Sequence, residues 1–560
     1  MRKPHANRLR VALIFPNTYF VGMSNLGFQT MYRLFNEQPD IVCERAFLPA
    51  KQELASLRDA GTRLVTLESQ TPLSDFDVIA FSVSFEWDYT NVLTMLRMAG
   101  LPVRAADRDY TSPLVVIGGA VTFVNPEPLA PFADVIAAGE GEALVPALLD
   151  AFGTSSRSEQ LRRLAQQRGY YIPSFYDVEY APDGTIARYV PREGTGAPPI
   201  VKKAALKTTD AVDPPSTTIF TPDTEFGSRF LVEVVRGCVN LCRFCWAGYN
   251  YLPVRAFPTQ RILDLASAAR THASRAGLVS IALCDHPDIE HILRSLKEMG
   301  YSISPASLRL DDLTPTIVSL LQESGERTLT IAPETGSDRL RRVINKTITN
   351  EEILDRAELM FSSGIESLKL YYMIGLPTED DADLVAIRDL TMQLHAIMLK
   401  HARARGRIGR IVASVNPLVP KPGTAYQWLP MAPADEIERK MKRMRALVAD
   451  IDNVYFNIKS ERHSYYQALL SLGDRRIAPA IEAAEANGGE WRKAVADSGV
   501  DGDFYIYRDR GNDAVLPWSI IDGGMKEPFF RSEFEKSTRA EWTLPPKRAK
   551  ENARLLPVIS

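Results

Sequence analysis

Short apolar runs alternate with amphipathic stretches along most of the chain, which is the pattern of an α/β protein. In the first 150 residues, apolar runs typical of buried parallel strands cover residues 11–15, 78–84, 114–117 and 134–138. Helical periodicity lies between them, for example over residues 24–36 and 89–99. Because a loop of small or polar residues follows each run, we predict a Rossmann-like, doubly wound domain over residues 1–152.

A second strand–helix alternation, with a longer period, begins near residue 230. Its candidate strands cover residues 231–235, 279–283, 303–308, 328–332, 367–372 and 411–415. Six β/α repeats predict a partial barrel over residues 230–428, with its active face at the carboxyl ends of the strands. Residues 153–229 form a connector in which Asp183-Gly184 predicts a hairpin. Residues 429–560 open with an amphipathic helix and are expected to form a C-terminal α+β cap.

Composition excludes several classes of protein. The 560 residues are 45% hydrophobic and 24% charged, with a net charge of −3. These values are typical of a soluble globular protein and give no overall field that would attract nucleic acid. The sequence has no run of 18 apolar residues, so no membrane span is predicted. Few cysteines and no recognisable export signal predict a reducing, cytoplasmic location without disulfides.

Three of the five cysteines lie in one loop directly after the first strand of the second domain. Cys238, Cys242 and Cys245 have the spacing C-x3-C-x2-C. Thiolates from a short loop hold iron–sulfur clusters, and three of them would leave one iron of a four-iron cubane open to a small-molecule ligand. A structural zinc site would need a second ligand pair, which the sequence lacks. Cys43 and Cys284 are isolated, and an isolated cysteine is more often a small buried hydrophobe.

Motifs around and beyond this loop resemble the radical S-adenosylmethionine (SAM) superfamily. They lie at residues 235–255, 331–337, 369–379 and 419–424. The resemblance runs from residues 22–27 to 516–518 and points to a branch that pairs the barrel with an N-terminal cobalamin-binding-like domain. It implies a [4Fe-4S] cluster on the three cysteines, bound SAM, a 5′-deoxyadenosyl radical, and an external reductant such as flavodoxin or ferredoxin.

The resemblance also suggests SAM-binding residues on the later strands. Glu334 ends the fourth strand and could accept hydrogen bonds from the ribose hydroxyls or the amine of SAM. Gly375 lies in a turn, and because it has no side chain the backbone could approach the adenine there. Phe244 would lie close to the adenine or seal the cluster. Glu379 closes the same motif. An ordinary strand end and helix cap is the alternative for this stretch.

One departure concerns the Gly-Gly-Glu element that often follows the second strand and holds the SAM amine. Here that place contains Asp285, which could substitute for it electrostatically or cap a helix. Arg309, at the end of the third strand, could bind the SAM carboxylate through two hydrogen bonds. A structural salt bridge is the alternative for Arg309.

The strand ends of the first domain supply candidates for holding cobalamin, namely Ser82, Ser84, Gly118, Gly119, Gly139 and Glu140. The glycines do not form G-x-G-x-x-G, so a nicotinamide site has little support. His5 is the only histidine in the first 150 residues, and the histidine-bearing D-x-H-x-x-G loop is absent. Either cobalamin binds without a protein imidazole, or the domain kept the fold and lost the cofactor.

The leading hypothesis is a radical SAM enzyme, with cobalamin-dependent methylation of an unidentified substrate as the first candidate for its outcome. A radical SAM enzyme without cobalamin is the first alternative. Methylthiotransfer normally needs three more N-terminal cysteines, which Cys43 alone cannot supply. An iron–sulfur electron-transfer protein without SAM turnover is an alternative of a different class, but it leaves the motifs after strands four to six unexplained.

Overall fold

The computed structural model describes residues 3–543 apart from 153–155, 306–307, 311–312, 450, 512 and 514. The chain forms two compact units. The first contains Met1–Lys207, Thr217–Ser228 and Gln467–Gly524, and the second contains Thr208–Ser216, Arg229–Tyr466 and Met525–Ser560. The segment predicted to be a C-terminal cap is therefore divided between both units.

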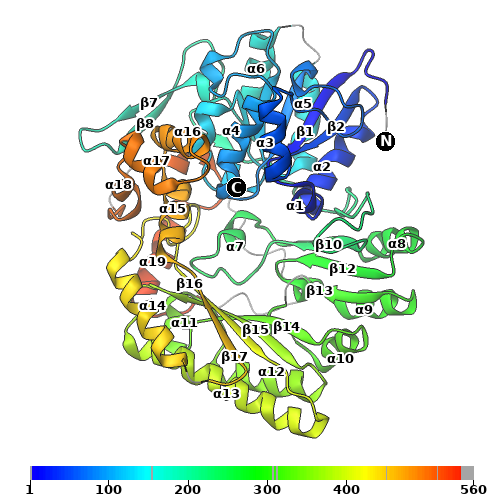
Figure 1. Ribbon diagram of the computed structural model, residues 1–560, viewed down its shortest axis with the longest axis vertical. Coiled ribbons are helices and arrows are strands. Elements are labelled where there is room, and N and C mark those ends of the chain that lie inside the picture. Colours follow the sequence, from blue (N-terminus) through cyan, green and yellow to red (C-terminus); the bar gives the residue numbers. More distant parts are fainter. Residues whose placement is uncertain are drawn as a thin grey trace. The chain divides into compact units, whose positions relative to one another are not determined.

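A six-stranded sheet forms the centre of the first unit, with helices on both of its faces (Figure 1). Its strands are β1 (Leu9–Phe15), β2 (Ile41–Phe47), β3 (Val78–Ser82), β4 (Leu114–Gly118), β5 (Val135–Ala137) and β6 (Tyr170–Tyr171). They lie in the order β2-β1-β3-β4-β5-β6 and are parallel except for β6. This is a doubly wound order in which β1 and β3 flank the point of reversal. The predicted Rossmann-like fold is confirmed.

The helices of the first unit come from both ends of the chain. They are α1 (Tyr19–Met23), α2 (Leu26–Glu37), α3 (Lys51–Asp59), α4 (Tyr89–Met98), α5 (Gly141–Phe152), α6 (Arg157–Ala165), α16 (Ala478–Ala486), α17 (Trp491–Ser498) and α18 (Gly502–Ile506). The predicted hairpin is present as β7 (Tyr176–Tyr180) and β8 (Ile186–Pro191). A short parallel pair, β9 (Val201–Lys202) with β18 (Ile521–Asp522), joins the connector to the C-terminal segment.

The second strand of this sheet was not predicted, because two charged residues interrupt its apolar pattern. Glu44 and Arg45 lie in the middle of β2. Glu44 is nevertheless buried and accepts hydrogen bonds from Thr66 and Ser69, while Arg45 pairs with Glu68 at 2.7 Å. Paired charges can be buried in a strand at little cost, but a sequence pattern does not show the partner.

The second unit contains two four-stranded sheets. The first has the order β11 (Arg255–Ala256), β10 (Phe230–Arg236), β12 (Arg275–Ser280), β13 (Ser302–Pro305), and the second β14 (Thr328–Glu334), β15 (Ser367–Ile374), β16 (Ile411–Pro417), β17 (Val454–Ile458). All pairs are parallel except β10 with β11. Among the described residues no ladder joins β13 to β14, so the strands form a partial barrel, as predicted.

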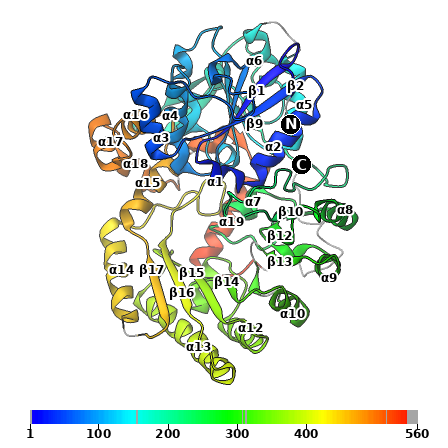
Figure 2. The same cartoon turned by 45° about the vertical axis from the view of Figure 1, so that its right-hand side comes forward.

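Helices follow the strands of the second unit on the outside of the sheets (Figure 2). They are α8 (Thr259–Ala269), α9 (Ile289–Glu298), α10 (Pro315–Glu323), α11 (Asp338–Val343), α12 (Asn350–Ser362), α13 (Asp381–Arg405) and α14 (Ala434–Val448), with the short α7 (Trp246–Asn250) after β10. From the C-terminal part, α15 (Glu461–Leu472) leads into the first unit, and α19 (Glu527–Thr538) belongs to the second. No helix in the described part of the chain has the length and apolarity needed to cross a membrane.

The second barrel strand lies earlier than predicted. It was expected over residues 279–283, but β12 spans Arg275–Ser280, and a single helical turn at Leu283–Asp285 follows it. Gly277, which reads as a strand breaker, lies where a Cβ atom would be 2.5 Å from Leu231 Cδ2 on β10. A larger residue there would displace the Leu231 side chain, so the glycine is explained by strand packing and not by a turn. Strand β17 adds a seventh parallel strand beyond the six predicted.

Candidate radical SAM site

The three-cysteine loop (residues 237–245) joins β10 to α7. It begins at Gly237, where any other residue would be strained. Gly237 has φ +98°, and a Cβ atom there would lie 2.6 Å from the Tyr251 carbonyl oxygen. Cys238 and Cys242 are buried, and Cys245 is half-buried. Burial raises the pKa of the Cys242 and Cys245 thiols, so ionised thiolates here need a compensating positive charge.

The described residues show no single-ion site at the cysteine loop. No three His, Cys, Asp or Glu side chains within the described ranges are placed to hold one metal ion. Thiolates around one zinc ion lie ~2.3 Å from it, so their sulfurs would lie within about 4 Å of one another. Thiolates on three corners of a cubane are farther apart, because each binds a different iron. Three thiols without a fourth ligand do not complete a structural zinc site, whereas on a four-iron cluster they leave one iron open.

The end of α11 and the residues that follow it hold the cysteine loop in place. Arg243, between the second and third cysteines, has no exposed side-chain surface. Its backbone N–H donates to the Ile344 carbonyl oxygen at 2.9 Å, and its guanidinium donates to the carbonyl oxygens of Arg342 and Val343 at 2.7 and 3.0 Å. Asn345 Nδ2 donates to the carbonyl oxygens of residues 240 and 241 at 3.2 Å each. These bonds fix the backbone that carries the thiols.

The next residue, Lys346, supplies the positive charge. Its Nζ lies 3.2 Å from Glu334 Oε1, at the carboxyl end of β14. Burial opposes protonation, but the charges of Glu334 and Cys242 raise the pKa of Lys346 above its ordinary value. In turn Lys346 favours ionisation of Cys242 and Cys245. The second carboxylate oxygen of Glu334 makes no hydrogen bond with a described residue, so the pair leaves one acceptor for a ligand.

Three residues of this assembly have strained backbone conformations. Leu241, Glu334 and Asn345 have φ of +47°, +65° and +54°, in the left-handed region that non-glycine residues rarely adopt. Such conformations persist where the surrounding contacts fix them, and they are concentrated at functional sites. The structure therefore places local strain at the cysteine loop, at the end of β14 and at the segment that joins them.

On the other side of the loop, Asp285 and Arg309 form an ion pair. Arg309 Nη1 lies 3.1 Å from Asp285 Oδ1 and 3.9 Å from Cys238 Sγ. The side chains are 7% and 11% exposed for the aspartate and arginine respectively. Both residues predicted after the second and third strands thus meet beside the first cysteine. The pair satisfies the salt-bridge alternative for Arg309 and at the same time places a second cation at the thiols.

Phe244, Gly375 and Glu379 have packing roles in the structure. Phe244 packs against an apolar cluster that includes Leu376, so the cysteine loop and the turn after β15 share one core. At Gly375, φ is +76° and a Cβ atom would lie 2.6 Å from Ile437 Cδ1 on α14. Glu379 is fully buried; its Oε2 accepts a hydrogen bond from Gly375 N and lies 2.8 Å from Lys440 Nζ. The glycine and the glutamate are thus explained by the turn and by α14, and their SAM roles stay predictions.

The candidate cobalamin loops of the first unit lie close to other parts of the chain. A Cβ atom at Gly119 would lie 2.4 Å from the Val83 carbonyl oxygen, and one at Gly139 would lie 2.2 Å from the Ala204 carbonyl oxygen. Glu140 Oε2 accepts a hydrogen bond from Leu206 N at 2.9 Å. These close approaches to protein backbone explain the glycines, and their role in holding cobalamin stays a prediction.

The other three candidates, Ser82, Ser84 and Gly118, also contact the protein chain. Ser84 Oγ accepts a hydrogen bond from Asn25 Nδ2 at 3.2 Å, and Ser82 pairs with Gly118 across the sheet. A Cβ atom at Gly118 would make only ordinary contacts. Beyond them, Asn125 Nδ2 donates to the carbonyl oxygens of residues 471 and 473, which places the C-terminal segment against the loop after β4. The cobalamin role of the six residues therefore stays a prediction.

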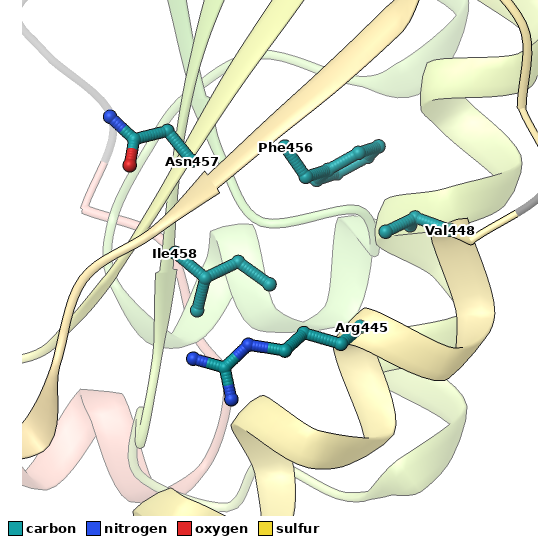
Figure 3. Close-up of a pocket in the computed structure, with 5 residues that line it drawn as sticks. All are labelled: Arg445, Val448, Phe456, Asn457 and Ile458. Carbon is teal, nitrogen blue, oxygen red and sulfur yellow. The ribbon is translucent and has the colours of Figure 1, made fainter.

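A pocket in the second unit lies apart from these residues. It has a volume of about 400 Å³ and is lined by Arg445 and Val448 of α14 and by Phe456, Asn457 and Ile458 of β17. Figure 3 shows Phe456 and Ile458 on the side of β17 that faces α14, with Asn457 on the other side. None of the predicted site residues lines this pocket, so we assign it no role in the chemistry.

Sequence reasoning missed Arg243, Asn345 and Lys346. Arg243 stands between two cysteines without a motif of its own, and the other two follow α11 without belonging to a recognised motif. The one available indication was Asn345-Lys346 directly after a short helix that itself follows the 331–337 motif. Their contact with the cysteine loop could not be read from the sequence.

Comparison with known proteins agrees with this site. The family model of the radical SAM superfamily matches residues 232–391, and that of the N-terminal region of radical SAM proteins matches residues 27–173. The chain therefore belongs to the radical SAM superfamily, in a branch that has an N-terminal domain before the barrel.

Individual relatives are distant. An uncharacterized protein of Methanocaldococcus jannaschii is 28% identical over 422 residues, covering 74% of this chain and 79% of that protein. The methyltransferase TsrM from Kitasatospora setae, solved with cobalamin and a [4Fe-4S] cluster, is 12% identical with a TM-score of 0.51, over 88% of this chain and 99% of TsrM. OxsB, a cobalamin-dependent SAM radical enzyme, is 15% identical with a TM-score of 0.46; the match covers 68% of this chain and about half of OxsB (52%). At this identity the likeness to TsrM shows the fold alone.

Proposed function

We propose that this protein is a radical SAM enzyme in which Cys238, Cys242 and Cys245 hold a [4Fe-4S] cluster and the fourth iron binds SAM. The observation that carries the proposal is the Glu334–Lys346 pair beside the cysteine loop. An electron-transfer protein needs only the thiols, whereas the carboxylate oxygen left over on Glu334 suits a ligand with hydrogen-bond donors. A cluster bound there would supply the electron that cleaves SAM to methionine and a 5′-deoxyadenosyl radical.

The side chains around the loop have separate parts in this proposal. Lys346 balances the negative charge of Cys242 and Cys245, and Arg309, paired with Asp285, has its Nη1 3.9 Å from Cys238 Sγ. Glu334 accepts hydrogen bonds from the ribose hydroxyls or the amine of SAM, and Arg309 is placed to bind its carboxylate. Phe244 closes the apolar side of the site with the cluster of residues around Leu376.

Anaerobic incubation with SAM and dithionite tests the proposal. We expect reconstituted protein to release 5′-deoxyadenosine and methionine in equal amounts, and a variant with Ala at all three cysteines to release neither. An electron-transfer protein would take up the cluster and accept electrons without consuming SAM. A full cluster without any SAM cleavage would therefore support that alternative and reject the proposal.

Cobalamin-dependent methylation of an unidentified substrate is a second candidate function. It is favoured by the strand order of the first unit, which is of the kind that binds ligands at the β1–β3 switch point. Near that point Asn17 Nδ2 donates to Asp88 at 2.8 Å, and Phe20 and Phe85 are 50% and 61% exposed. A corrinoid at the switch point would lie close to these residues.

Incubation with hydroxocobalamin and removal of the unbound excess tests this second candidate. A stoichiometric corrinoid spectrum of the base-off type, without histidine ligation, would support it, and Phe85→Ser should then reduce uptake. Protein that retains no corrinoid would leave a radical SAM enzyme without cobalamin. In either case we expect a soluble reductant such as flavodoxin or ferredoxin as partner and a cytoplasmic location, since an oxygen-sensitive cluster needs reducing conditions.

A further inference from the structure

The cysteine loop is held from its outer side by the C-terminal part of the described chain. We call residues 527–543, which comprise α19 and the extension after it, the clasp. The clasp and the cysteine loop both belong to the second unit. Although the clasp follows the loop by almost 300 positions, its contacts with the loop are buried and polar. A covering segment with no specific role would more often make apolar or exposed contacts.

The central contact is an ion pair that is entirely removed from water. Arg243 Nε and Nη2 both lie 3.2 Å from Glu533 Oε2, and neither side chain has exposed surface. The other oxygen, Oε1, accepts hydrogen bonds from Lys536 Nζ at 2.8 Å and from Thr543 Oγ1 at 2.5 Å. Arg243 also donates to the carbonyl oxygen of residue 541 at 2.8 Å. The Glu533 carboxylate is fully occupied within the clasp and the loop.

Two further contacts reach the loop on either side of Arg243. The ring of Phe530 packs against Tyr249 at 5.3 Å between centroids, and Tyr249 OH donates to the Leu241 carbonyl oxygen at 3.0 Å. Thr543 N donates to Asn345 Oδ1 at 2.9 Å, and the amide of the same asparagine holds the loop carbonyls. The clasp thus acts on both supports of the loop, namely α7 and the segment after α11.

We propose that the clasp sets the position and the electrostatics of the cysteine loop, with Glu533 as a positioning residue that acts through Arg243. This inference rests on the proposed function, since it concerns the cluster that the loop would hold. Removing the carboxylate would leave a buried guanidinium without its counter-ion, next to two cysteines. The loop should then shift to hydrate or re-pair Arg243, and the added positive charge should make a bound cluster easier to reduce.

The test compares Glu533→Gln with Glu535→Gln in the full-length, anaerobically reconstituted protein. The control removes the same charge from the same helix at an exposed position. Iron release to a ferrous chelator is followed without SAM, well below the unfolding temperature, and the midpoint potential of the cluster is measured separately. We expect at least tenfold faster iron release and a less negative potential for Glu533→Gln, with the control within twofold of wild type.

Two more variants keep the test decisive. Glu533→Asp retains the charge and should recover most of the wild-type potential, and Tyr249→Phe should speed iron release with little effect on the potential. If Glu533→Gln does not fold, Tyr249→Phe decides the matter. Unchanged iron release and potential in folded Glu533→Gln, or unchanged iron release in Tyr249→Phe, would overturn the clasp, as would a fall in unfolding temperature without any change at the cluster. If wild type itself takes up no cluster, the proposed function fails first and this inference fails with it.

Discussion

Replacing Glu334 with Gln tests whether the carboxylate at the end of β14 contacts SAM. The amide keeps the shape of the side chain but removes the charge that faces Lys346 and the oxygen that is left for a ligand. Hydrogen bonds that involve a charged group contribute about 1.5–3 kcal/mol each. We therefore expect SAM to bind about 10- to 100-fold more weakly, at about 1.4 kcal/mol for each tenfold change.

Binding is measured by calorimetric titration of SAM into reconstituted protein under anaerobic conditions and without reductant, so that no turnover occurs. Iron content should stay at the wild-type level, because the cysteines and their supports are untouched. Glu351→Gln, an exposed residue in the first turn of α12, is the matched control and should bind SAM like wild type. A dissociation constant within twofold of wild type for Glu334→Gln, at full iron content, would refute a contact between this residue and SAM.

Three other perturbations have definite expected results. Replacing any one of Cys238, Cys242 and Cys245 with Ala should remove most of the iron after reconstitution, as measured by iron assay and visible absorption; a full cluster in the triple variant would contradict the ligand assignment. Gly375→Ala should lower the free energy of unfolding by about 1–3 kcal/mol in urea, with or without SAM, because φ is +76° and Ile437 occupies the space; an unchanged midpoint would mean that the turn can relax. Burial raises the pKa of Asp88 from 3.8 to about 6, so the folded state binds the extra proton between these values and stability falls as pH rises through them. Asp88→Asn should therefore be more stable than wild type at pH 7, by about 2–3 kcal/mol, and equally stable below about pH 4; an equal difference in urea unfolding at both pH values would contradict this pKa.

The candidate site was predictable only where its residues are close in sequence or end a strand. The three cysteines were found because their spacing is local, and Asp285, Arg309 and Glu334 because each follows a barrel strand. The structure brings the last three to the cysteine loop even though the second strand was placed four residues too late. The glycines of the first unit stay predictions as cofactor contacts, because close approach to the protein's own backbone requires glycine just as a ligand does.

The sequence by itself determined the α/β alternation, the two sheet-based domains and the three-cysteine loop. Each of these depends on a periodicity or spacing within some 20 residues, and such patterns survive in a one-dimensional string. Tertiary structure alone decided which distant residues support the loop. Arg243 and Glu533 are 290 positions apart, and Asn345 reaches the loop over more than 100. A buried charge is tolerated only when its partner is present, and only the folded chain shows which residue that partner is.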